Sequence, residues 1–246
     1  MNKSKISSIL KQGDCLEILK KLPNDSVDLV VTDPPYEIET SGGGLYNQED
    51  KKYIKELNTI SNGFDKNILD ELVRVMKKVN IYLFCSQKQI PVLLDYFLKN
   101  QKNKEHILYK RKINWNLLSW HKTNPVPACG NKYLSDTEYI MFFREQGVKI
   151  YGSFGTKKTH YETPLWVKDK KLYNHPTCKP TFIVENFIVN SSLENEIVLD
   201  PFMGSGTTGE ACIKNNRKFI GIEIDETYFN TAKQRIREVE EIQQKE

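Results

Sequence analysis

The sequence predicts an α/β protein with a mostly parallel sheet and helices on both faces. Seven short apolar runs rich in Val, Ile, Phe and Tyr alternate with six runs of helical pattern. Continuous apolar runs are typical of strands buried on both faces, and strands that alternate with helices at this spacing form parallel sheets. The length of 246 residues suits one domain, so we expect a single domain over residues 1–246.

The same patterns place each element along the chain. Strands are predicted at residues 8–11, 27–32, 81–85, 113–121, 139–144, 196–199 and 219–224. Helices are predicted at residues 15–21, 66–77, 89–99, 181–191, 206–215 and 226–243. The helix at 66–77 has apolar residues at helical spacing from Ile68 to Met76, and Pro180 stands where a first helical residue can be proline.

Three segments interrupt this alternation. We expect loop insertions at residues 37–64 and 123–136, and a longer connection at residues 146–175. Loops of this length in a compact domain are usually functional or disordered. The third segment mixes Lys157 and Lys158 with Tyr161 and Trp166, which suits contact with nucleic acid, although an ordinary surface excursion is the alternative.

Composition excludes several classes of protein. Apolar residues form 39% of the chain, which rules out wholesale disorder, yet no apolar run approaches eighteen residues, so no membrane helix is expected. The first residues lack the apolar core of a signal peptide. The five cysteines lie far apart and form no CxxC pair, which argues against a disulfide scaffold and a zinc site. We therefore expect a reduced, cytoplasmic protein without a metal.

Charge is informative through its distribution rather than its total. The net charge is only +4, but residues 99–122 contain seven basic side chains and one acidic side chain. Such a run is either a solvated face or a surface for a polyanion. Residues 223–246 are, by contrast, mostly acidic among their charged positions.

The first motif with chemical content is Asp33-Pro34-Pro35-Tyr36, which follows an apolar strand. In open α/β sheets, ligands bind beyond the carboxyl ends of the strands. The two prolines fix the backbone and remove two donors, while their carbonyls still accept hydrogen bonds. Asp33 adds a charged acceptor and Tyr36 adds a flat face. Together they suit a planar ring that carries an exocyclic amine; a stiffened strand exit with a surface Tyr is the alternative.

The second motif runs from Asp200 through Gly204 and Gly206 to Thr208, as a strand, a glycine turn and a helix. Glycines let the backbone approach a ligand, and a helix start presents free N–H groups. The Lys of a phosphate-binding P-loop is missing, so a nucleotide triphosphatase is disfavoured. Glu223 ends the next apolar strand, 23 residues after Asp200, and an acid at this spacing suits ribose hydroxyls.

The two motifs together resemble the amino-methylating DNA methyltransferases that use S-adenosylmethionine. The motif at Asp33–Tyr36 precedes the one at residues 200–208, an order similar to that of the family's beta group, and the segment at residues 175–180 matches a third family motif, HPTxKP. The resemblance extends from Gly13 to Glu223. It implies a Rossmann-like, S-adenosylmethionine-dependent methyltransferase fold with a seven-stranded sheet and permuted motif order.

The resemblance also implies roles within the cofactor site. Asp200 would lie near the ammonium of the methionine end, and the turn from Gly204 to Gly206 would pass under that end. Glu223 would take the ribose, and Asp14 would lie near the adenine. A plain turn with a helix cap is the alternative for Asp14.

The remaining cofactor residues lie beside these. Ser205, Thr207, Thr177 and Lys179 would help to hold the cofactor's carboxylate. Phe202 would line the pocket, with core packing as its alternative.

For the reaction, the resemblance implies transfer of a methyl group to adenine N6 of a base flipped out of double-stranded DNA. Asp33 and the Pro34 carbonyl would accept the amine hydrogens, with Pro35 and Tyr36 completing the catalytic motif. Cytosine N4 is the first alternative, but enzymes of that type more often carry Ser at the position of Asp33. Methylation of a glutamine or an RNA base, and a catalytically inactive DNA-binding relative, are further alternatives. Both are disfavoured, the first by the motif order and the second by the intact motifs.

The resemblance extends to partners. It is compatible with a homodimer and with a cognate restriction endonuclease beside the DNA substrate. The connection at residues 146–175 would be the target-recognition segment.

Overall fold

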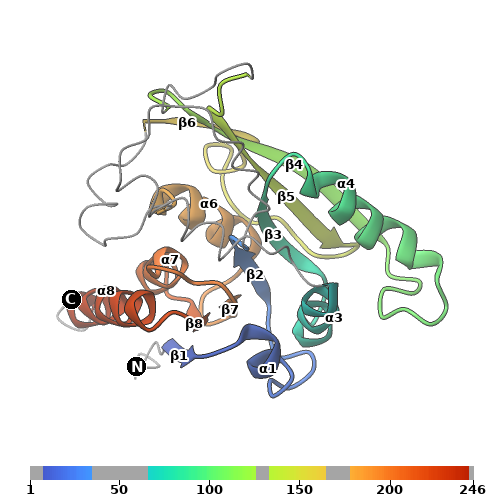
Figure 1. Ribbon diagram of the computed structural model, residues 1–246, viewed down its shortest axis with the longest axis horizontal. Helices are drawn as coiled ribbons and strands as arrows, with labels where there is room; N and C mark the ends of the chain where they lie inside the picture. The colour runs from blue at the N-terminus through green and yellow to red at the C-terminus, as the bar shows by residue number, and fades with distance from the viewer. Residues whose placement is uncertain (1–7, 35–65, 126–132, 165–177, 244–246) are drawn as a thin grey trace, which may run out of the picture.

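The computed structural model describes residues 8–34, 66–125, 133–164 and 178–243. These residues form one eight-stranded sheet of strand order β1-β8-β7-β2-β3-β5-β4-β6 (Figure 1). The strands are β1 (Ser8–Gln12), β2 (Leu29–Thr32), β3 (Asn80–Cys85), β4 (Ile113–Lys122), β5 (Thr137–Glu145), β6 (His160–Thr163), β7 (Ile197–Asp200) and β8 (Lys218–Glu223).

Strand direction gives this sheet two unlike edges. Neighbouring strands pair in parallel except at β5, which is antiparallel to both β3 and β4. Every described strand except β5 therefore ends at the same edge, which we call the carboxyl edge. Ligands of open α/β sheets bind at this edge.

Helices cover both faces of the sheet. One face is covered by α1 (Cys15–Leu19), α3 (Lys66–Val75) and α4 (Gln89–Leu94), and the other by α6 (Thr181–Ser191), α7 (Thr207–Lys214) and α8 (Glu226–Gln243) (Figure 1). No helix in the described part of the chain is long and apolar enough to cross a membrane.

The period-two geometry of the strands divides the core between the two faces. In β2, Val30 packs toward α3, while Leu29 and Val31 pack toward α6. In β3, the Tyr82 ring stacks between Phe142 of β5 and Phe187 of α6, with centroids 4.0 and 4.3 Å away. Burial on both faces explains why these strands have continuous apolar sequences.

The predicted α/β class and mostly parallel sheet are confirmed, but the strand count of seven is wrong for this sheet. The eighth strand, β6, lies inside the predicted connection 146–175 and pairs in parallel with the end of β4. It has only four residues, of which Tyr161 and Thr163 are buried, too short an alternation to recognise between loop residues. The predicted helix 89–99 also changes character, because α4 passes into a π-helical turn at Asp95–Lys99.

Candidate functional site

Four acidic residues lie where adjacent strands reach the carboxyl edge. Glu223 ends β8 and Asp200 ends β7, while Asp33 directly follows β2. Asp14 follows β1 by two residues, and the Gly13 amide beside it donates to the Glu223 carbonyl at 2.9 Å. Because β1, β8, β7 and β2 are neighbours in the sheet, motifs from both ends of the chain meet here.

Asp33 and Asp200 are joined through the end of β2. Val30 of β2 pairs with Leu199 of β7, so the two strands end side by side. The Thr32 hydroxyl, one residue before Asp33, donates to Asp200 Oδ1 at 2.8 Å in a buried bond. Sequence reasoning missed Thr32, although a polar residue at the end of an apolar strand was a usable signal.

Asp200 is buried and receives three hydrogen bonds. Besides Thr32, the Phe202 amide donates to Oδ1 at 3.1 Å and the Thr208 hydroxyl donates to Oδ2 at 2.7 Å. Burial raises the pKa of Asp200 to about 7; the hydrogen bonds counteract this shift, and the charge of Asp33 adds to it. A cation bound beside Asp200 would favour its ionised form.

Glu223 fixes the glycine turn to the end of β8. Its Oε2 accepts from the Gly204 amide and its Oε1 from the Asp225 amide, both at 2.9 Å. Burial raises its pKa despite these bonds. Each carboxylate oxygen has about two acceptor positions, so this group can also receive hydroxyl donors from a ligand.

Asp14 has the geometry of a helix cap. Its Oδ1 accepts from the Glu17 amide at 3.0 Å, which satisfies one of the free donors at the start of α1. Its side chain is exposed at the same edge as Glu223. The alternative reading of a turn with a cap is therefore present in the structure, and the ligand role of Asp14 stays a prediction.

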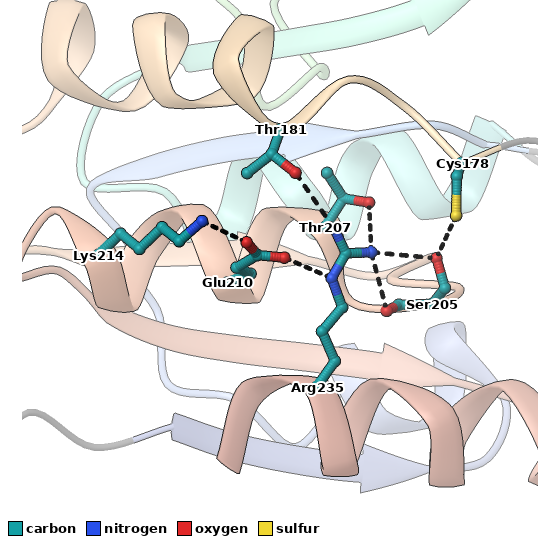
Figure 2. A network of polar contacts seen from close by, with 7 residues as sticks. All are labelled: Cys178, Thr181, Ser205, Thr207, Glu210, Lys214 and Arg235. Atoms are coloured by element: carbon teal, nitrogen blue, oxygen red, sulfur yellow. Dashed lines mark hydrogen bonds and ion pairs between the residues drawn. The ribbon is translucent and has the colours of Figure 1, made fainter. Parts of the chain in front are cut away.

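A buried arginine of α8 holds the far side of the glycine turn (Figure 2). Arg235 is 3% exposed and pairs with Glu210 of α7, which also pairs with Lys214. It donates to the Ser205 carbonyl at 3.3 Å, to the Thr207 hydroxyl at 3.0 Å and to the Thr181 hydroxyl at 3.1 Å. We call these contacts of Arg235 with Glu210, Ser205, Thr207 and Thr181 the turn-side cluster.

The turn-side cluster gives Ser205 and Thr207 protein partners. Both residues are buried, and the Ser205 hydroxyl also contacts Cys178 Sγ at 3.0 Å (Figure 2). Phe202 is half-buried and packs against the core on the α3 face. These placements agree with roles in supporting the turn, while direct contact with a ligand stays a prediction for all three.

Glycines in this turn serve packing as well as ligand approach. Gly206 has φ +83°, and a Cβ there would lie 3.0 Å from the backbone of Ala232 in α8. A Cβ at Gly209 would lie 2.3 Å from Ile236 Cδ1. Residues 204–209 form a G-x-G-x-x-G pattern, and its third glycine, Gly209, allows close packing of its helix.

Lys179 lies at Asp33. Its ammonium contacts Asp33 Oδ2 and lies 3.2 Å from Glu138 Oε2 of β5. The other oxygen of Glu138 pairs with Lys122 of β4 at 2.7 Å. We call Asp33, Lys179, Glu138 and Lys122 the catalytic-side cluster. Sequence reasoning missed Glu138, although a charged residue at the start of an apolar strand was a signal.

Three predicted site residues lie outside the described residues: Pro35, Tyr36 and Thr177. Pro34 is described and buried directly after Asp33. The catalytic motif is therefore placed by its first half, and the positions of Pro35 and Tyr36 stay predictions.

The two basic segments that could contact DNA, residues 99–122 and 146–175, do not lie wholly at the carboxyl edge. Residues 99–112 follow α4 and lead into the start of β4, at the edge opposite Asp33. β4 has ten residues, so about 33 Å separates this part from Lys122 at the carboxyl edge. The connection 146–175 first packs on the end of α6, where the Tyr151 amide donates to the Asn190 carbonyl at 2.7 Å. It returns to the carboxyl edge only through β6, and residues 165–177 lie outside the described residues.

Comparisons with known proteins identify the family of this chain. Residues 27–234 match the DNA methylase family N6_N4_Mtase. The Type II methyltransferase M.HinfI of Haemophilus influenzae is 30% identical, over 95% of this chain and 69% of that protein. The Type II methyltransferase M2.LlaDCHI of Lactococcus lactis subsp. cremoris is 29% identical, over 94% of this chain and 90% of that protein.

Solved structures agree on the fold. The structure of the M1.HpyAVI–SAM complex superposes with a TM-score of 0.64 at 26% identity, covering 93% of this chain and 99% of that one. This similarity confirms the predicted methyltransferase fold. The family match spans most of the chain and includes both the strand before Asp33 and the glycine turn after Asp200. The chain therefore belongs to the N6/N4 DNA methylase family.

Proposed function

We propose that this protein transfers a methyl group from S-adenosyl-L-methionine to adenine N6 in DNA, as the methyltransferase of a Type II restriction–modification system. One observation carries the proposal. The catalytic motif directly follows β2, the glycine turn directly follows β7, and these two strands are paired. The Thr32 hydroxyl at the end of β2 donates to Asp200 Oδ1 at the end of β7 at 2.8 Å. A base held at Asp33 and a methyl donor held at the glycine turn would therefore meet at one edge of the sheet.

The acidic residues at this edge suit the cofactor. S-adenosylmethionine carries an ammonium, a sulfonium and ribose hydroxyls, and it supplies an activated methyl group with a good leaving group. Asp200 would attract the ammonium and Glu223 would accept from the ribose, with Asp14 beside the adenine ring. Gly204 and Gly206 would form the floor, with Phe202 at its side.

The cofactor's carboxylate needs donors rather than acceptors. The first turn of α7 provides backbone N–H groups and the positive end of the helix dipole. Ser205 and Thr207 would hold this turn for the carboxylate, and Thr177 would complete the pocket. This differs from direct binding by Lys179, whose ammonium lies at Asp33 and Glu138.

Catalysis would rest on positioning of the amine. An exocyclic amine is a weak nucleophile because its lone pair is delocalised into the ring. Asp33 and the Pro34 carbonyl would accept its two hydrogens, which favours a tetrahedral nitrogen, while Tyr36 stacks on the ring. The nitrogen would gain the methyl group as the bond from that group to sulfur breaks, with the electron pair of the broken bond left on sulfur, and would then lose one proton to water. Such a transfer needs alignment and electrostatics but no covalent enzyme intermediate.

The choice of adenine rests on the sequence. Asp33 is the residue that adenine-N6 enzymes usually carry, whereas cytosine-N4 enzymes more often have Ser there. We also propose that the chain acts as one domain with its target-recognition segment inside 146–175, nearest the site after β6. A homodimer and a cognate restriction endonuclease are further proposals.

The test is direct methylation by the purified chain. DNA of diverse sequence is incubated with isotope-labelled S-adenosylmethionine, digested to nucleosides and analysed by mass spectrometry, and intact DNA is sequenced for modified bases. We expect N6-methyladenine at one short site, formed far more slowly by Asp33→Ala. N4-methylcytosine as the main product would overturn the base assignment, and absence of transfer by the wild-type chain would overturn the proposed function.

A further inference from the structure

Lys179 is surrounded by groups of the catalytic half. It is 7% exposed, and its ammonium contacts Asp33 Oδ2, lies 3.2 Å from Glu138 Oε2 and lies 5.2 Å from the centroid of the Phe84 ring. Two carboxylates and an aromatic face therefore converge on one ammonium. An anionic ligand at Lys179 would have to approach past both carboxylates, at a point where charge repulsion opposes it.

The nearby residues Cys178 and Thr181 contact the glycine turn and its supporting arginine. Cys178 contacts Ser205 in the glycine turn, and Thr181 accepts from Arg235 behind it (Figure 2). Lys179, between them in the chain, contacts Asp33. The segment 178–181 thus joins the two halves of the site, and Lys179 is its connection to the catalytic half.

Glu138 keeps the ammonium in place. Its Oε2 is buried and receives no hydrogen bond from the described residues, so Lys179 is the charge that compensates it. Burial raises the pKa of Glu138, but Lys179 and Lys122 lower it by more. Burial lowers the pKa of Lys179, but Asp33 and Glu138 raise it by more. Glu138 and Lys179 are therefore both held in their charged forms.

An ammonium against Asp33 has a chemical consequence. The charge of Asp33 raises the pKa of Asp200, which ends the neighbouring strand, and that of the Cys85 thiol of β3, so like charges at these groups would oppose one another. A protonated Asp33 would present a donor to the target amine instead of an acceptor. A cation at Oδ2 favours the charged carboxylate and fixes its orientation.

We propose that Lys179 is a positioning residue for methyl transfer, which holds Asp33 oriented and ionised toward the target amine, and that Glu138 sets the strength of this hold. The proposal rests on the proposed function, because it assigns Asp33 the role of acceptor. It replaces the expectation from sequence that Lys179 binds the cofactor's carboxylate.

The experiment uses the full chain and the DNA site found in the methylation test. Single-turnover transfer is measured against pH at saturating cofactor, and cofactor affinity is measured by calorimetry. The variants are Lys179→Met, Lys179→Arg and Glu138→Gln. The matched control is Lys77→Met, which removes a lysine paired with Asp28 at 2.7 Å, just before the start of β2 instead of after its end.

We expect Lys179→Met to lower the transfer rate about 100-fold, as misplacement of a reacting group does, while cofactor affinity stays within about threefold. In the plot of transfer rate against pH, the fall in rate on the acidic side should move up by about one pH unit for this variant, because the cation beside Asp33 is gone. We call this part of the plot the acidic limb. Lys179→Arg should recover most of the rate. Glu138→Gln should move the limb down, because Lys179 then faces Asp33 alone. Lys77→Met should match wild type.

Opposite shifts of the acidic limb separate this role from a structural one, since general loss of packing would not move the two variants apart. Cofactor affinity lowered tenfold or more by Lys179→Met, with an unchanged rate at saturation, would overturn the proposal. If Lys179→Met does not fold, Glu138→Gln decides: a downward shift supports the proposal, and any other result refutes it. Because the wild-type chain is assayed in parallel, failure of the proposed function itself would be visible separately.

Discussion

Two buried cations of the site, Arg235 and Lys179, have different surroundings. Arg235 in the turn-side cluster is paired with the carboxylate of Glu210 and also donates to neutral carbonyl and hydroxyl oxygens. Lys179 in the catalytic-side cluster contacts two carboxylates, Asp33 and Glu138, which both lie at the carboxyl edge.

The difference separates geometry from charge. A guanidinium with five donors in a rigid fork suits a place where several backbone and hydroxyl oxygens must be fixed at once. A single ammonium suits a place where one carboxylate must stay charged. We therefore expect loss of Arg235 to appear mainly in stability, and loss of catalytic-side groups to appear mainly in the rate of transfer.

The largest effect is expected from Arg235→Met. Glu210, the Ser205 carbonyl and the Thr207 hydroxyl would lose a buried donor, and breaking a buried pair typically lowers stability by about 3–5 kcal/mol. Urea unfolding measures the change in free energy. The control Arg237→Met removes an arginine that is 77% exposed and paired with Glu241, where about 0.5 kcal/mol or less is expected. Equal effects of the two variants would contradict the assignment of Arg235.

The next effect tests the catalytic side. Asp33→Ala should lower single-turnover methyl transfer by about 10²–10³-fold, because it removes an acceptor that acts on the reacting amine. Cofactor affinity by calorimetry should change by less than about threefold. If affinity instead falls as much as the rate, Asp33 belongs to the cofactor site and the two regions are not functionally distinct.

The sequence predicts the polar ends of strands better than the contacts between them. Asp33, Asp200 and Glu223 were identifiable because each follows an apolar run, and parallel strands end together. The partner of Lys179 was not identifiable in this way. Its neighbours Asp33 and Glu138 are 146 and 41 positions away in the chain. They come together because β5 pairs antiparallel with β3, which places the start of β5 at the carboxyl edge.

Arg235 shows a signal that was available and unused. Ala232 and Ile236 of α8 are buried at helical spacing, and Arg235 falls on the same stripe. A charged residue inside an apolar stripe indicates a buried partner. The identity of that partner, Glu210, still depends on how α8 packs on α7, which a single sequence does not specify.

A smaller effect is expected from Glu223→Gln on the cofactor side. The two oxygens of Glu223 accept from two backbone amides, and an amide side chain can accept at only one of these positions. We expect cofactor affinity to fall about tenfold, as for loss of one hydrogen bond to a charged group, with an unchanged transfer rate at saturation. The control is the nearby Asp225, whose Oδ1 accepts from the Tyr228 amide; Asp225→Asn should leave cofactor affinity unchanged.

The last effect concerns Asp200, which borders both regions through Thr32 and Thr208. Its pKa in the folded protein is about 7, above the ordinary value of 3.8. Between these two values the folded state binds more protons than the unfolded state, so this group makes stability fall as pH rises. The slope contributed by one such group cannot exceed about 1.4 kcal/mol per pH unit.

Asp200→Asn isolates this contribution, because Asn can keep both bonds at Oδ1 and donate to the Thr208 hydroxyl in place of accepting from it. Urea unfolding of the cofactor-free protein at pH values from 5 to 8 should show wild type losing stability relative to the variant up to about pH 7, with a constant difference above it. Saturating cofactor should flatten the wild-type slope, since a bound cation favours the ionised carboxylate. Parallel pH profiles of the two proteins without cofactor would mean that Asp200 is already charged in the folded protein. Asp200 would then resemble the groups of the catalytic-side cluster, which are held in their charged forms.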